Sequence, residues 1–237
     1  MKKQVAAGDS RARIDGDGDQ PESRGGMRPF VIVSGPAAPL LRANIDTDVI
    51  IRIERITQLA KSELGRYAME ALRYLSDGSD DPAFILNQPA FRNAPVLLAG
   101  SNFGSGSSRE HAVWALQGMG LRCVIAPSFG DIFYSNCFQN GMLPIRLPMD
   151  AVEQLAAQCA DGASLTIDLQ ACTITTPDGG SMPFTTDPTR RDALLQGLDD
   201  IGRTLKDDAA ILSWQKADRT RRPWAWPKAR AAPAAVR

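Results

Sequence analysis

The region that most constrains the fold is residues 94–148, where short apolar runs alternate with segments of helical periodicity. Three runs, APVLLAG at 94–100, LRCVIAPS at 121–128 and MLPIRLP at 142–148, have the length and apolar character expected of buried strands. Between them, 108–120 and 129–141 carry apolar residues at helical spacing and end in glycine-containing stops. This alternation predicts right-handed parallel crossovers, and hence an α/β core.

The flanking segments predict further elements of the same domain. An apolar run begins at Phe30, and the polar stretch NIDTD at 44–48 is followed by the β-branched run Val49 to Ile53, which predicts a strand. The remaining predicted elements are short helices and loops at 57–92, a helix at 150–160, an antiparallel hairpin around the PDGG turn at 164–185, and helices at 187–205 and 207–217.

The length of 237 residues allows one sizeable core with appendages. We predict a folded domain at 28–217. Residues 1–27 are polar, glycine-rich and poor in large apolar side chains, which predicts a disordered tail, and 218–237 predict a flexible, proline-rich basic tail. The DGDGDQ stretch in the first tail resembles the start of a calcium loop, but Gln20 and Gly26 occupy the positions that need glycine and glutamate.

Composition excludes several classes of protein. The 27 basic and 27 acidic residues balance, so nothing in the charge predicts binding to nucleic acid or to an anionic membrane. The four cysteines are 14, 22 and 13 positions apart and only one histidine accompanies them, which predicts free thiols and no metal site in this chain. Because the sequence has neither a signal-like stretch nor a long apolar span, we expect a cytoplasmic protein.

The segment GSGSSREHAVWAL, residues 104–116, has the pattern of an anion-binding helix start. It follows a predicted parallel strand, so it falls at the carboxyl edge of the sheet, where open α/β folds bind ligands. Gly104 and Gly106 free the backbone amides to turn toward an anion, Ser107 or Ser108 is expected to cap the helix, and Arg109 adds a permanently charged fork.

Three other interpretations of this segment compete with the anion site. A nucleotide phosphate loop requires a lysine that is missing here, and a serine hydrolase elbow requires a G-x-S-x-G motif and a histidine elsewhere in the chain, whereas His111 is the only histidine. A simple serine cap beside an exposed arginine fits the local pattern as well as an anion site does. The local pattern alone does not decide between the anion site and the simple serine cap.

The rest of the chain favours the anion site, through a resemblance to a known family. It rests on ANIDTDVII at 43–51, NFGSGSSREHAVWAL at 102–116, VIAPSFGDIFYSNCFQNGMLPI at 124–145 and GLDDIGRTL at 197–205. These segments closely resemble the small subunits of 3-isopropylmalate dehydratases, in the aconitase superfamily. The resemblance implies a swivelling β/β/α domain, as in the aconitase C-terminal domain, with a mixed sheet and flanking helices.

The resemblance also implies a partner and a reaction. The partner is a large iron–sulfur subunit, in a heterodimer or heterotetramer, which carries a four-iron four-sulfur cluster, while this chain binds no cofactor. Together the two chains would isomerise 2-isopropylmalate and 3-isopropylmalate, small branched dicarboxylic acids, by dehydration and rehydration in leucine biosynthesis. The chain would thus be half of a hydro-lyase, active only with its large subunit.

The family motif G-S-S-R carries residue roles onto this sequence. It implies that Ser107 is the base that removes a proton from carbon and that Arg109 grips a substrate carboxylate. The resemblance implies that substrate contacts come from Gly106, Ser108, Asp46, Thr47 and Asp48. An Asx turn that opens a strand is an equally good interpretation of the last three.

Departures from the family pattern fall on Arg52, Ser101, Ser105 and Val113, none of which is in the G-S-S-R core. Arg52 and the segment 63–76 leave the substrate open between isopropylmalate and the substrates of paralogues, citraconate or 2-methylmalate and homoaconitate. An interpretation from another class is a non-catalytic swivel-domain protein that binds RNA or a protein partner, against which the neutral charge counts.

Overall fold

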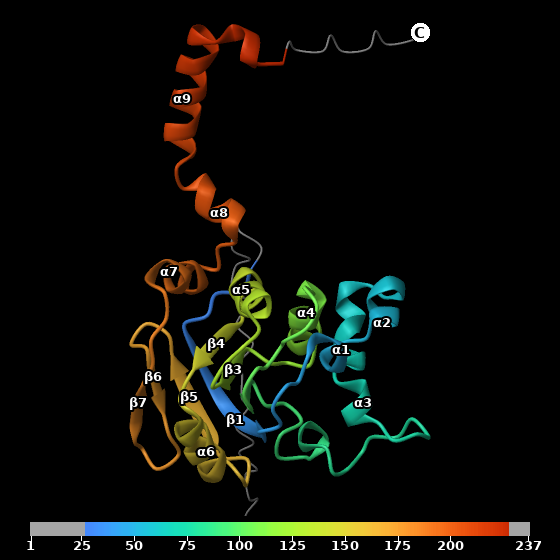
Figure 1. Cartoon of the computed structure of the whole chain (residues 1–237). Coiled ribbons are helices and arrows are strands. Elements are labelled where there is room, and N and C mark those ends of the chain that lie inside the picture. The colour runs from blue at the N-terminus through green and yellow to red at the C-terminus, as the bar shows by residue number, and fades with distance from the viewer. Residues whose placement is uncertain (1–26, 228–237) are drawn as a thin grey trace, which may run out of the picture.

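A computed structural model describes residues 27–227 and is built on a mixed, seven-stranded sheet of order β4-β3-β2-β1-β5-β6-β7 (Figure 1). The β1–β4 strands pair in parallel, and β5–β7 pair antiparallel beyond β1. The strands are β1 (Ile32–Leu40), β2 (Val96–Ala99), β3 (Cys123–Ala126), β4 (Leu143–Arg146), β5 (Ser164–Asp168), β6 (Thr173–Thr175) and β7 (Ser181–Pro183). The mixed sheet and the parallel core are as predicted, and the PDGG turn joins an antiparallel pair, β6 and β7, although the segment predicted as one hairpin holds three strands.

The central strands are buried on both faces. In β2, Leu97 and Ala99 join a core cluster under α4 (Glu110–Gly118) and α5 (Asp131–Gln139). Val96 and Leu98 join a second cluster on the opposite face, under α6 (Met149–Gln158) and α7 (Pro188–Gln196). Because successive strand residues point to opposite faces, a run that is apolar throughout needs cover on both sides, which the helices supply.

The connection from β1 to β2 contains only short helices. They are α1 (Thr47–Ile50), α2 (Ile53–Gln58), the 3₁₀ helix η1 (Lys61–Tyr67), α3 (Glu70–Arg73) and the 3₁₀ helix η2 (Ile85–Asn87). The predicted strand at 49–53 is therefore wrong. Asp46 caps α1 by accepting a hydrogen bond from the amide of Val49 (2.8 Å), and this helical turn buries Ile50 in the core, which overrides the β preference of the branched side chains.

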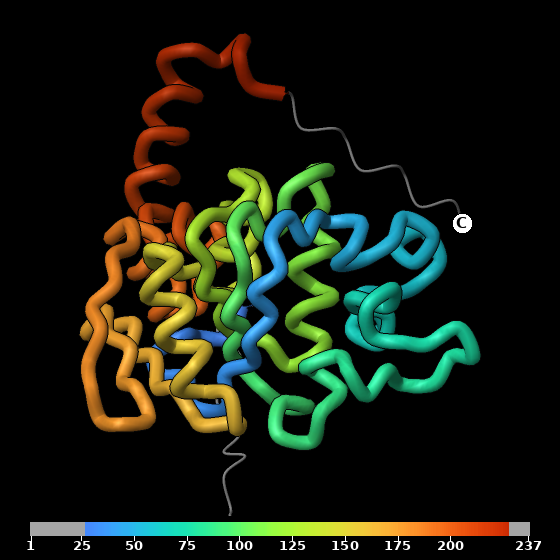
Figure 2. Tube along the Cα trace, turned by 60° about the horizontal axis from the view of Figure 1, so that its bottom comes forward, coloured from blue at the N-terminus to red at the C-terminus, as the bar shows by residue number. Residues whose placement is uncertain are grey.

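Beyond α7 the chain leaves the body. Figures 1 and 2 both show α8 (Asp200–Leu205) and α9 (Asp208–Arg221) standing out from the sheet, ending in the 3₁₀ helix η3 (Pro223–Ala225). The predicted start of the flexible tail at 218 falls inside α9. The predicted tail at 1–27, the DGDGDQ stretch in it, and the end of the second tail from 228 lie outside the described residues, apart from Met27.

The cysteines are free thiols, as predicted. Cys123, Cys137 and Cys159 are buried, and burial raises the pKa of each thiol, that of Cys159 to about 11. Among residues 27–227 no helix has the length and hydrophobicity needed to cross a membrane, and no group of three or more histidine, cysteine or acidic residues is arranged to hold a metal ion.

Candidate active site

Three loops meet at the carboxyl edge of the parallel strands: 41–46 after β1, 100–109 after β2 and 127–130 after β3. Backbone hydrogen bonds join them. The amide of Gly104 donates to the carbonyl of Ile45 (2.7 Å), the amide of Thr47 to the carbonyl of Ser105 (2.8 Å), and the amide of Phe103 to the carbonyl of Ser128 (3.0 Å). The loop that follows β2 is thus fixed between its two neighbours, at the edge where the sequence predicts a ligand site.

The NIDTD stretch builds the wall of the site against the 104–109 loop. The carboxylate of Asp46 is used to cap α1. Thr47 is buried, and its hydroxyl donates to the carbonyl of Ser107 (3.0 Å). Asp48 is the exposed member of the three. Direct contact of Asp46 or Thr47 with a substrate stays a prediction, while their contacts within the chain give both a structural role.

Two glycines let the 104–109 loop pass close to its surroundings. Gly104 and Gly106 have φ of +69° and +91°, a region that favours glycine. A Cβ on Gly104 would lie 2.2 Å from the ring of Phe133, whereas one on Gly106 would make only ordinary contact with Asp46, at 3.4 Å. Gly104 is needed for space and for φ, and Gly106 for φ alone.

The helix that follows begins later than predicted. α4 starts at Glu110 with Arg109 in the N-cap position, and no side chain caps it, so the predicted serine cap is wrong. The reason is that the chain turns from Gly106 to Ser108 to bring the Ser107 carbonyl to Thr47. The hydroxyls of Ser107 and Ser108 are consequently free of hydrogen bonds to residues 27–227, and both residues are exposed beside the positive end of the helix.

The guanidinium of Arg109 is held in place by hydrogen bonds from one of its nitrogen atoms, Nη1. Its Nη1 forms a hydrogen-bonded ion pair with the Asp48 carboxylate and also donates to the carbonyl of Ile51 (3.4 Å). Within the described chain no acceptor meets Nε or Nη2. The side chain is only 14% exposed, so the fork is fixed in place with a free edge that matches a carboxylate.

His111 is not arranged as a hydrolase histidine. Its ring packs edge-on against Trp114, with the centroids 4.6 Å apart, and it forms no hydrogen bond with a serine of the described chain. The Ser107 hydroxyl has no histidine to activate it. A catalytic serine here depends on the surrounding amides and on Arg109.

Three polar residues of the site edge were not singled out from sequence. Asn102 donates from Nδ2 to the Oδ1 of Asn44 (2.8 Å), and the Ser128 hydroxyl accepts from the amide of Asn102 (2.8 Å). Both asparagines have positive φ. The sequence pattern that could have identified these three residues is their position after predicted strands, at the same sheet edge as the G-S-S-R motif.

Arg52 and part of the 63–76 segment, the positions expected from sequence to bear on the choice of substrate, line a hollow of about 590 Å³, called the arginine hollow below. Arg55 pairs with Glu70 (2.9 Å) and its guanidinium covers the ring of Tyr67 at 4.1 Å, while Arg52 lies 3.7 Å from the same carboxylate. Arg66 also lines the hollow, which therefore carries three cations and one anion. Arg52 directly follows Ile51, whose carbonyl accepts a hydrogen bond from Arg109.

This fold and this loop define a class, the aconitase C-terminal domain: residues 27–150 match the family model of that description, and 153–188 match the model described as LeuD_N. The "3-isopropylmalate dehydratase small subunit" of Rhodospirillum centenum is 50% identical over 201 residues, which cover 84% of this chain and 99% of that protein. The protein of the same name from Cereibacter sphaeroides is 50% identical over 200 residues, covering 84% and 100%.

A solved structure agrees with these relatives. The crystal structure of 3-isopropylmalate dehydratase (leuD) from Methanocaldococcus jannaschii has a TM-score of 0.57 and 28% identity, and the match covers 78% of this chain and 99% of that one. This chain belongs to the family of 3-isopropylmalate dehydratase small subunits.

Proposed function

We propose that this chain is the small subunit of a hydro-lyase that interconverts 2-isopropylmalate and 3-isopropylmalate in leucine biosynthesis, and that it works in the cytoplasm. The observation that carries the proposal is the 106–109 loop, in which free serine hydroxyls lie beside a guanidinium fixed with one edge open. Family membership supports the same assignment.

Ser107 is the proposed base. A serine hydroxyl is hardly ionised at neutral pH, so it needs groups that stabilise its alkoxide. The backbone amides at the start of α4 carry partial positive charge, and the guanidinium of Arg109 carries a full one. Both can stabilise the alkoxide, because they are in place before the substrate binds. The Ser107 alkoxide takes the proton from carbon and becomes a neutral hydroxyl, the electron pair of that C–H bond forms the alkene, and the neighbouring hydroxyl departs as water after accepting a proton from an acidic group of the large subunit. Rehydration then returns the hydroxyl to the other carbon.

Arg109 is the proposed clamp for a substrate carboxylate. Its Nε and Nη2 can donate hydrogen bonds to the two oxygens of a carboxylate, while Asp48 and the Ile51 carbonyl hold Nη1. Gly106 and Ser108 would contact the same group through an amide and a hydroxyl. In this arrangement Asp48 is a positioning residue, since it acts through Arg109.

We propose that the large subunit supplies the metal centre of the reaction. The small-subunit family implies such a partner, and we propose that it carries a four-iron four-sulfur cluster, in a heterodimer or heterotetramer with this chain. When bound, the cluster would act as a Lewis acid for the departing hydroxyl. Ser107 and Ser108 are exposed in the isolated chain, so the partner would also exclude water from them.

The arginine hollow supports a second candidate substrate. Its three arginines against one glutamate give a cationic lining, which suits the acidic arm of homoaconitate better than an isopropyl group. This observation favours a homoaconitate-type paralogue as the second candidate function. A pocket discriminates between substrates with related side chains by only about 1–3 kcal/mol per group. The kcat/KM values of the candidate substrates must therefore be compared directly.

The decisive experiment is reconstitution of the purified chain with its large subunit and an intact cluster, followed by a panel of isopropylmalate, 2-methylmalate, citraconate and homoaconitate. We expect no turnover by either chain alone and the highest kcat/KM on isopropylmalate with the pair. A higher kcat/KM on homoaconitate would instead assign the second candidate. If the chain co-purifies with nucleic acid and the pair turns over none of the acids, the non-catalytic interpretation holds.

Replacing Asp48 with asparagine should raise KM about threefold to tenfold with little change in kcat. The substitution keeps the shape but weakens the charge-assisted bond that fixes Arg109, and the 57% exposure of Asp48 limits the loss. Steady-state kinetics of the reconstituted pair measure this split, and Asp150→Asn on α6 is the matched control. A fall in kcat at unchanged KM would contradict the positioning role and assign Asp48 to the chemistry.

A further inference from the structure

Two asparagines bridge the loops that follow β1 and β2. The Nδ2 of Asn102 donates to the Oδ1 of Asn44 (2.8 Å), and both residues are exposed. Both have positive φ, +56° for Asn44 and +60° for Asn102. Asparagine tolerates this conformation, but glycine adopts it more readily because it has no Cβ. An asparagine at such a position supplies what glycine lacks, a side chain that forms a hydrogen bond.

The two loops leave the sheet and return to it together. β1 and β2 last pair at Leu40 and Ala99, and pairing resumes where Asp46 forms a bridge with Ser105, six residues further along each segment (40 to 46 and 99 to 105). Because the register is the same before and after, the two loops are excursions of equal length. The bond between the two asparagines spans these excursions, so it holds one loop against the other.

The asparagine bond lies next to the bonds that fix the 104–109 loop. Ile45, the residue after Asn44, accepts a hydrogen bond from the amide of Gly104 (2.7 Å). Thr47 then donates through its hydroxyl to the carbonyl of Ser107 (3.0 Å). The bonds between the two loops therefore form a series that begins at the asparagines and ends at Ser107.

Asn102 also contacts the loop that follows β3. Its backbone amide donates to the hydroxyl of Ser128 (2.8 Å), and the amide of the next residue, Phe103, donates to the Ser128 carbonyl (3.0 Å). Asn102 is thus the residue at which all three loops of the site are joined, through its side chain to one neighbour and through its backbone to the other.

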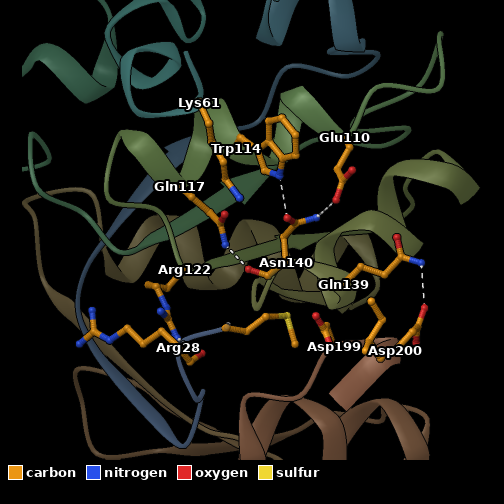
Figure 3. A pocket seen from close by; sticks show the side chains of 12 residues that line it. Arg28, Lys61, Glu110, Trp114, Gln117, Arg122, Gln139, Asn140, Asp199 and Asp200 are labelled. Atoms are coloured by element: carbon orange, nitrogen blue, oxygen red, sulfur yellow. Dashed lines mark hydrogen bonds between the residues drawn. The ribbon is translucent and has the colours of Figure 1, made fainter. Parts of the chain in front are cut away.

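The other end of the 104–109 loop is held by the packing of helices. In a hollow of about 560 Å³ (Figure 3), Asn140 donates to Glu110 (2.8 Å) and accepts from the indole of Trp114 (2.7 Å). Glu110 directly follows Arg109. These bonds are part-buried and join the end of α5 to α4, so replacing Asn140 would disturb the helices as well as the loop. The exposed asparagine pair belongs to neither core cluster, so its bond can be removed without disturbing them.

We propose that Asn44 and Asn102 are positioning residues for Ser107, which they hold through the series of bonds between the two loops. This rests on the proposed function, in which Ser107 is the base. A misplacement of about 1 Å in a reacting group can cost about 100-fold in rate. Arg109 is held by other residues, so loss of the asparagine bond should leave substrate binding nearly unchanged.

The test replaces each asparagine with glycine, which keeps the backbone conformation and lacks the side chain. In the chain assembled with its large subunit, we expect Asn102→Gly and Asn44→Gly each to lower kcat about tenfold with KM nearly unchanged. Because the two residues share one bond, the double variant should also lose about tenfold, whereas independent effects would give about 100-fold. Asn44→Asp keeps an oxygen that accepts from Asn102, so it should restore kcat to within about twofold of the wild type.

Ser34→Ala is the matched control, because it removes an exposed side-chain bond of the same length, to Thr166 (2.8 Å), between β1 and β5. It should keep the wild-type kcat. Hydrogen exchange in the isolated chain gives a second measurement. The amide of Gly104 should exchange about tenfold faster in both glycine variants, while that of Leu98 in β2 stays unchanged.

Wild-type kcat in both glycine variants would overturn the proposal, and so would a loss of about 100-fold in the double variant. A rise in KM at unchanged kcat would also overturn it and would assign the asparagines to substrate binding. A wild-type pair that turns over none of the acids, while exchange at Gly104 still rises in both variants, would contradict the proposed function and leave the hold on the loop standing.

Discussion

Replacing Ser107 with alanine, in the chain assembled with its large subunit, is expected to lower kcat about 10³-fold while KM and subunit affinity stay nearly unchanged. The hydroxyl forms no hydrogen bond to residues 27–227, so its removal takes away no structural contact. What is lost is the proposed proton acceptor. Single-turnover kinetics measure the step, and a thermal melt of the variant should match the wild type.

The control for this prediction is Ser105→Ala. It removes the same atom from the same loop, two residues earlier, where the backbone carbonyl and not the hydroxyl is used to hold Thr47. The control should keep near-normal turnover. If Ser107→Ala is as active as Ser105→Ala, Ser107 is not the base, and the free hydroxyl of Ser108 becomes the candidate.

The α/β core could be predicted from sequence because each strand there is short, apolar and bounded by glycine-containing turns. Val96 to Ala99 and Cys123 to Ala126 alternate between the two core clusters, which is why both runs lack polar residues. The strand expected at 49–53 failed for a physical reason. Periodicity cannot separate a short apolar run from a helical turn, and the cap at Asp46 together with burial of Ile50 decided the outcome.

The position of the site was predictable, but its internal contacts were not. The G-S-S-R motif follows a parallel strand, which alone puts it at the ligand-binding edge. The ion pair of Arg109 with Asp48 joins residues 61 positions apart, and the bond between Asn44 and Asn102 joins residues 58 apart. Such contacts depend on how two loops meet after folding, which no local pattern encodes.

The C-terminal helices also could be predicted only in part. Helical periodicity predicts helices at 187–205 and 207–217, the first of which the structure divides after Gly197 into α7 and α8, but it cannot show whether their apolar side chains face the body. In the structure Leu205 and Leu212 remain more than half exposed, so the apolar side chains that make these helices recognisable are not buried by the described chain.

Replacing Gly104 with alanine should lower the free energy of unfolding by about 3 kcal/mol, the second large effect that the structure predicts. Part of the loss comes from φ of +69°, which costs an L-residue about 1–2 kcal/mol. The rest comes from the new Cβ, which would lie 2.2 Å from the ring of Phe133. That ring is itself buried and packs edge-on against Phe103, so it has little room to move.

Gly106→Ala separates the two causes, because Gly106 has φ of +91° but space for a Cβ. Its loss should be limited to about 1–2 kcal/mol. Denaturant unfolding of the two variants measures the difference, which is the steric part alone. Equal losses would mean that Phe133 yields to the new methyl group. In that case the close contact between the loop and α5 does not fix the position of Ser107, and only the bonds to Ile45 and Thr47 do.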